Sequence, residues 1–196
     1  MNVLLLSMPD AFEHMPPVAI RMPNGALTSL AGNVDAHHRV AAADLILVQS
    51  SVRATLERLV RDLNPDVVGL SVMTFQRTTA LAIARLIRRL RPAARIVVGG
   101  YDPSLAPEPY EAAPEIDFVV RGEGEQTFRE LLRALETTGG DVTAIAGLSH
   151  RTVDGRLVHN VARPIAALAR EPLELPRRSA RVLDGYTLLG RRVDVI

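Results

Sequence analysis

Residues 97–128 read VVGGYDPSLAPEPYEAAPEIDFVVRGEGEQTF and contain two glycine-bearing turns, each directly after a short β-rich run. The first turn carries Gly99 and Gly100, and the second carries Gly122 and Gly124. A glycine after a strand permits positive φ and lets a ligand approach the backbone closely. Neither turn matches a Walker or dinucleotide-binding fingerprint. The stretch therefore predicts two glycine-containing turns that a ligand can approach, without the signature of a nucleotide site.

Strand-like and helix-like patterns alternate on either side of this stretch. Strands are expected in residues 2–6, within 39–48, and in 67–73, 94–98 and 116–120, with helices in 25–30, 52–63, 83–90 and 128–135. Continuous apolar strands separated by helices indicate a parallel sheet covered on both faces. Right-handed crossovers then give a doubly wound α/β fold of about five strands, whose ligands bind beyond the carboxyl ends of the strands.

The pattern changes after Asp141. Residues 147–158 alternate around an Asp154-Gly155 pair, which predicts a β-hairpin. From Arg163 onward prolines and arginines without a sustained period indicate a linker along a surface, and the final run, residues 193–196, reads as an unfinished strand. We therefore expect the natural polypeptide to continue.

Composition limits the function classes. The 196 residues carry 23 basic and 22 acidic side chains, so net charge gives no argument for a nucleic-acid partner, and none is expected. The absence of cysteine excludes disulfides, thiolate metal sites and an iron–sulfur cluster within these residues. The amino-terminal apolar run is too short to span a membrane and lacks the basic lead of a signal peptide. The sequence thus predicts a soluble, cytoplasmic protein without a membrane partner.

Candidate binding residues follow the third, fourth and fifth expected strands. They are Ser71, Met73 and Thr74; Gly99, Gly100, Tyr101 and Asp102; and Gly122, Glu123 and Gly124. Simpler interpretations exist for each group: a strand-end cap, a tight turn, and acidic residues that complement a helix dipole. Asp102 is expected in a surface loop. No nucleophile–base–acid set is visible, so we expect no catalytic residue in the chain.

Three segments carry a family resemblance: NPDVVGLS (64–71), VGGYDPSLAPE (98–108) and VRGEGE (120–125). Together they resemble the cobalamin-binding domain at the amino end of cobalamin-dependent radical S-adenosylmethionine enzymes. The resemblance implies a flavodoxin-like domain in residues 1–142, a hairpin extension in 143–163, and a linker in 164–196 toward a radical domain of the same polypeptide. It also implies that cobalamin is held by the ten candidate residues, since glycines and small hydroxyls clear a path for its nucleotide tail. S-adenosylmethionine and a [4Fe-4S] cluster would belong to the radical domain alone, where the parent enzyme would perform methyl transfer, cyclisation or related radical chemistry.

The chain also departs from the family. Asp102 stands where members commonly have histidine, and no Asp-x-His-x-x-Gly loop is present. Asp10 with His14 has the wrong spacing, and the segment 35–38 (DAHH) lacks the glycine. We therefore expect no side chain of this protein to bind the cobalt of cobalamin. We also expect His150 and His159 to lie at the surface. The alternatives are a regulatory or interaction domain that has lost cobalamin, an unrelated doubly wound transferase, and a receiver domain.

Overall fold

The computed structural model describes residues 1–9, 23–138, 140–164, 173–188 and 190–192. The strands are β1 (Asn2–Ser7), β2 (Arg39–Asp44), β3 (Val67–Ser71), β4 (Arg95–Gly99), β5 (Phe118–Val120), β6 (Leu148–Arg151), β7 (Leu157–His159), β8 (Thr187–Leu188) and β9 (Arg191–Arg192). The α-helices are α1 (Gly25–Asn33), α2 (Val52–Leu63), α3 (Arg77–Leu90), α4 (Tyr101–Leu105) and α5 (Gly124–Glu136). Asp10 and His14 lie outside the described residues. Within those residues, no helix combines the length and the apolar character that crossing a membrane requires.

The main sheet has seven strands in the order β2-β1-β3-β4-β5-β6-β7. Strands β1 to β5 are parallel, which confirms the doubly wound fold. The predicted hairpin is present as β6 and β7, and it extends the sheet because β6 pairs antiparallel with β5. Strand order reverses between β1 and β3, which is where such folds bind ligands.

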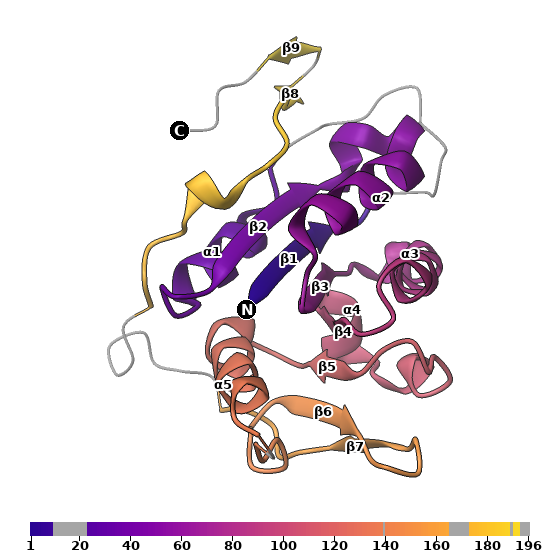
Figure 1. Ribbon diagram of the computed structural model, residues 1–196, viewed down its shortest axis with the longest axis vertical. Helices are drawn as coiled ribbons and strands as arrows, with labels where there is room; N and C mark the ends of the chain where they lie inside the picture. Colours follow the sequence, from indigo (N-terminus) through magenta and orange to yellow (C-terminus); the bar gives the residue numbers. More distant parts are fainter. Residues whose placement is uncertain (10–22, 139, 165–172, 189, 193–196) are drawn as a thin grey trace.

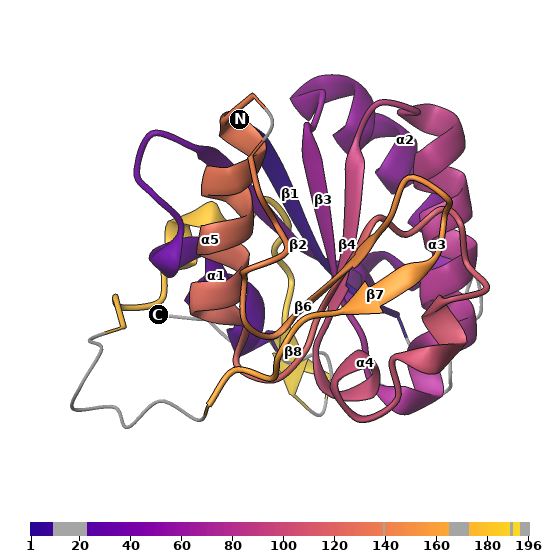
Figure 2. The same ribbon diagram turned by 90° about the horizontal axis from the view of Figure 1, so that it is seen from below.

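Helices cover both faces of the sheet, as Figure 2 shows: α1 and α5 lie on one side, and α2 and α3 on the other. Alternation along β1 supplies both cores. Leu4 and Leu6 pack in the core beneath α2 and α3, while Val3 and Leu5 pack with α1 and α5. Both faces of β1 are therefore buried, which explains its continuous apolar run.

The segment 173–188 runs along α1 and the outer edge of β2 (Figure 1). The backbone N–H of Arg177 donates to the carbonyl of Thr28 at 2.9 Å, and that of Val182 donates to the carbonyl of Ala42 at 2.9 Å. The Tyr186 hydroxyl donates to the buried Asp44 carboxylate. The segment thus covers part of the edge strand, which otherwise presents unpaired backbone groups.

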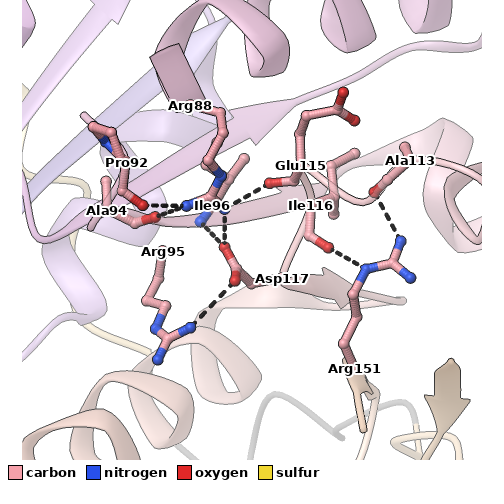
Figure 3. Close-up of polar contacts among 10 residues, drawn as sticks. All are labelled: Arg88, Pro92, Ala94, Arg95, Ile96, Ala113, Glu115, Ile116, Asp117 and Arg151. Atoms are coloured by element: carbon pink, nitrogen blue, oxygen red, sulfur yellow. Dashed lines mark hydrogen bonds and ion pairs between the residues drawn. The ribbon is translucent and has the colours of Figure 1, made fainter. Parts of the chain in front are cut away.

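A polar network fixes the amino ends of β4 and β5, away from the carboxyl edge (Figure 3). The Asp117 carboxylate accepts from Arg88 Nη2 at 2.6 Å, from Arg95 Nη1 at 3.3 Å and from the Ile96 N–H at 2.8 Å. Arg151, from β6, donates to the carbonyl of Ile116 at 2.7 Å. Strands of the parallel sheet and of the hairpin are therefore tied together at this end.

One expectation about the hairpin is wrong. His150 is buried, because β6 lies between β5 and β7 and is covered on both sides. His159 is exposed at the end of the outer strand β7, as expected. Its Nδ1 lies 2.7 Å from the hydroxyl of the fully buried Ser149.

Candidate cofactor site

A cavity of about 240 Å³ opens at the carboxyl edge of the sheet, on the face covered by α1 and α5. Strands β1, β3, β4 and β5 supply its floor and the two helices supply its walls. It is lined by Leu5, Ala26, Leu27, Leu30, Gly69, Leu70, Ser71, Val97, Gly99, Gly100, Val120, Gly122, Glu123, Gly124, Glu125 and Phe128. The two glycine turns of residues 97–128 therefore do face one cavity.

Glycines keep this cavity open. A Cβ at Gly69, inside β3, would come within 2.8 Å of Leu5 Cδ2, and one at Gly124 within 3.3 Å of Leu30 Cδ2. Side chains at these positions would occupy space that is now part of the site. Gly69 was not among the predicted binding residues, although a glycine inside a strand often marks a close approach.

Gly100 has a different reason to be glycine. Its φ is 100°, and a Cβ there would lie 2.9 Å from the backbone nitrogen of Val72. The Val72 N–H donates to the carbonyl of Gly99 at 2.9 Å, so the chains after β3 and β4 are in backbone contact here. The fold itself therefore requires glycine at this position, whatever the ligand.

Ser104 connects the two glycine turns. Its hydroxyl donates to the Gly100 carbonyl at 2.6 Å and accepts from the Gly122 N–H at 2.9 Å. Gly122 has a φ of 77°. One side chain on α4 thereby sets the spacing between the turns after β4 and β5. The signal for this residue in the sequence is limited to its place within the family-like segment 98–108.

The cavity wall is mainly apolar and carries no basic residue. Ser71 Oγ accepts from Asn24 Nδ2 at 3.4 Å, and Glu125 accepts from Ser29 Oγ at 2.7 Å. Glu123 occupies the N-cap position of α5 without a side-chain capping hydrogen bond, and Glu125 lies in the first turn, so both are helix-start residues as predicted. Two carboxylates without a lysine or arginine disfavour a polyphosphate, and the apolar walls suit a largely uncharged group.

The predicted site residues separate into three sets. Six line the cavity: Ser71, Gly99, Gly100, Gly122, Glu123 and Gly124. Met73, Thr74 and Tyr101 are exposed in the segments that follow β3 and β4, with Met73 45% and Tyr101 58% exposed. Asp102 belongs to neither set, because it is buried.

The expectation that Asp102 lies in a surface loop is wrong: the residue is 1% exposed. Its carboxylate accepts from Arg77 Nε and Nη2, and from the Tyr110 hydroxyl at 2.6 Å. Burial opposes ionisation, but the hydrogen bonds from Arg77 and Tyr110 outweigh it and hold the pKa of Asp102 below its usual value. Burial, followed by the bond to Asp102, raises the pKa of the Tyr110 hydroxyl. Asp102 is thus engaged by the protein's own groups.

A doubly wound sheet with a glycine-lined, apolar cavity beside its switch point defines a domain that binds a cofactor or other small molecule. Comparison with known families narrows this class. Residues 13–132 match the B12 binding domain family, and the chain belongs to it.

Individual relatives agree with the family. The chain is 29% identical over 191 residues to an uncharacterized methyltransferase of Pyrococcus horikoshii, covering 97% of the chain and 41% of the relative. It is 32% identical over 111 residues to the cobalamin-dependent radical SAM methyltransferase TokK of Streptomyces tokunonensis, covering 55% and 16%. The chain therefore spans less than half the length of these relatives.

A solved structure shows the same resemblance. The radical S-adenosylmethionine methyltransferase TsrM of Kitasatospora setae, determined with cobalamin and a [4Fe-4S] cluster bound, superimposes with a TM-score of 0.65 at 26% identity. The match covers 83% of the present chain and 31% of TsrM. The chain resembles the cobalamin module of radical S-adenosylmethionine methyltransferases and cyclases, as the sequence motifs implied.

Proposed function

We propose that this chain holds cobalamin at the carboxyl edge of the sheet, with the nucleotide tail of the cofactor in the cavity between α1 and α5. The observation that carries the proposal is the glycine-lined cavity itself. Its depth depends on Gly69 and Gly124, where side chains would fill it, and its walls are apolar and free of basic residues. These residues fit a bulky ligand that is largely uncharged.

Each predicted residue then has a distinct role. Ser71 and the cavity glycines, Gly99, Gly100, Gly122 and Gly124, would surround the tail, and Glu123 would lie at its entrance. The exposed Met73, Thr74 and Tyr101 would meet the corrin ring. Asp102 would act indirectly, because its carboxylate is occupied by Arg77 and Tyr110.

Bound cobalamin supplies a cobalt centre that can carry and transfer a methyl group. The protein's part is to bind the cofactor, orient it and exclude water from its tail. Apolar contacts from Leu30 and Phe128 favour burial of an aromatic base, and Ser104 holds the turns at a fixed separation.

We further propose that residues 1–142 form the cofactor domain of a longer radical enzyme and that residues 164–196 lead to its radical domain. The greater length of the relatives supports this arrangement. The parent enzyme would transfer a methyl group or form a ring, and its S-adenosylmethionine and [4Fe-4S] cluster would lie outside these cysteine-free residues. Reading the gene beyond Ile196 tests the arrangement: a C-x-x-x-C-x-x-C run is expected, and an immediate stop codon would contradict it.

Equilibrium dialysis against hydroxocobalamin tests the binding proposal. We expect a dissociation constant on the order of micromolar, because one side of the ring would stay in water. Gly99→Leu is the informative variant: a Cβ at Gly99 would make ordinary contacts of 3.5 and 3.6 Å with Val120, so the fold should survive while the cavity fills. Gly100→Val is unsuitable, since it would strain the backbone directly.

Ala54→Leu is the matched control, because it adds bulk at an exposed position of α2 on the opposite face of the sheet. The control should retain cobalamin and Gly99→Leu should lose it, with equal circular dichroism. Negligible retention by the unsubstituted chain at high micromolar ligand would refute the proposal and favour a domain that has lost its cofactor.

A further inference from the structure

Two histidines and a glutamate meet at the edge of the sheet opposite the cofactor cavity. His37 and His38 precede β2, and Glu136 is the last residue of α5. His37 Nε2 lies 2.8 Å from Glu136 Oε1, and His38 Nδ1 lies 3.5 Å from the same oxygen. One ligand atom from each of the three residues lies within 4.8 Å of the others. The amino terminus is beside α5 at this end of the molecule (Figures 1 and 2).

His38 turns its acceptor nitrogen, Nδ1, toward this cluster. Its side chain is fully buried, and its Nδ1 lies 3.2 Å from the α-ammonium group of Met1. An ammonium can only donate, so Nδ1 accepts and the ring proton resides on Nε2, which has no partner within the described structure. A metal ion would bind through Nδ1, taking the place of the Met1 ammonium.

The distances suit one small cation. A tetrahedral zinc ion with bonds of about 2.0 to 2.1 Å holds its ligand atoms about 3.3 Å apart. The separation of 3.5 Å between His38 Nδ1 and Glu136 Oε1 is close to that value. His37 Nε2 and Glu136 Oε1 are in direct hydrogen-bond contact at 2.8 Å, so an ion would replace that bond with only a small movement of the two side chains. Two imidazoles and one carboxylate are a ligand set that zinc accepts, whereas calcium and magnesium prefer oxygen ligands alone.

We propose that His37, His38 and Glu136 form a binding site for a first-row transition metal ion, with Zn²⁺ as the representative ligand. The ion would join the end of α5 to the turn before β2. The same two elements are already linked by Arg133, whose guanidinium donates to Asp35 at 2.6 and 2.7 Å. Because α5 begins at the cavity and ends here, the ion would anchor the far end of a cavity wall. The site does not depend on cobalamin.

Zinc titration against a chromophoric chelator tests the site on metal-stripped protein. The purification tag stays at the carboxyl end, because the Met1 amino group lies at the site. His37→Gln and Glu136→Gln should each weaken Zn²⁺ binding at least about tenfold. Glu57→Gln, an exposed change on α2, is the matched control and should bind as the unsubstituted chain does.

Zn²⁺ should also raise the melting temperature of the unsubstituted chain and of Glu57→Gln, but not that of the two site variants. His38→Gln alone would be ambiguous, since a buried residue could affect folding. Absence of saturable Zn²⁺ binding, equal affinity in the site variants and the control, or tighter binding of Mg²⁺ than of Zn²⁺ would each overturn the proposal. Cobalamin dialysis of the same variants should be unchanged, so the two binding proposals can fail independently.

Discussion

Arg77 and Asp102 form a two-point ion pair, with Nε 2.8 Å from Oδ2 and Nη2 2.6 Å from Oδ1. Arg77 begins α3 and Asp102 lies in α4, so the pair connects the segments that follow β3 and β4. The guanidinium is partly exposed while the carboxylate is almost fully buried. The pair therefore fixes the start of α4, which directly follows the cavity-lining residues Gly99 and Gly100.

Asp102→Ala should lower the free energy of unfolding by about 2 to 4 kcal/mol, because it leaves a partly buried guanidinium and the Tyr110 hydroxyl without their partner. Asp102→Asn should cost less, since an amide oxygen still accepts from Tyr110. Urea unfolding measures both. Asp62→Ala, whose carboxylate forms an exposed pair with Arg61, should change stability by less than about 0.5 kcal/mol. Equal losses in the two alanine variants would show that the buried pair contributes nothing special.

Stability should also depend on pH through Asp102. Burial opposes the shift, but the bonds from Arg77 and Tyr110 hold its folded-state pKa below the unfolded value of about 3.9. The stabilisation that the ionised Asp102 carboxylate contributes is therefore complete above that unfolded pKa. It is lost as pH falls through the lower folded-state pKa. The stability difference between the unsubstituted chain and Asp102→Asn should shrink from about pH 4 downward. A difference that stays constant to pH 2 in urea melts would contradict this assignment.

Tyr186→Phe tests whether the segment 173–188 is part of the folded unit. The Tyr186 hydroxyl donates to Asp44, a carboxylate that is 2% exposed and also accepts from Ser7 Oγ at 2.7 Å. Loss of one donor to a buried charge should cost about 1 to 3 kcal/mol. Tyr101→Phe, at an exposed tyrosine, should change the unfolding free energy by less than about 0.5 kcal/mol. If both variants unfold at the same urea concentration as the parent, the segment is not stably docked.

Tyr101→Ala should affect binding and not folding. Its side chain is 58% exposed, directly after the glycine pair, so we expect at most a small change in unfolding free energy. Loss of an aromatic contact with the corrin ring should weaken hydroxocobalamin binding by up to about tenfold, or 1.4 kcal/mol. Dialysis beside Leu175→Ala, an exposed leucine in the segment 173–188, separates this contact from general loss of apolar surface. Equal affinities would remove Tyr101 from the site.

Local patterns in the sequence determined the fold class, the parallel strands and the place of the cavity. The apolar run of residues 2–6 and the glycines after β4 and β5 carry that information in neighbouring residues, because strand burial and turn geometry have local signatures. The motifs 64–71, 98–108 and 120–125 also led to the family that residues 13–132 match.

Tertiary structure alone decided the burial of Asp102, the backbone contact at Gly100 and the addition of the hairpin to the sheet. It also brought His37 to Glu136, 99 residues further along the chain. Such features depend on which distant segments pack together. Asp102 follows a glycine turn, as a surface residue would, yet it is buried and hydrogen-bonded to Arg77 and Tyr110. Local sequence fixes what each segment can form, while long-range packing sets which side chains lose water and which partners they find.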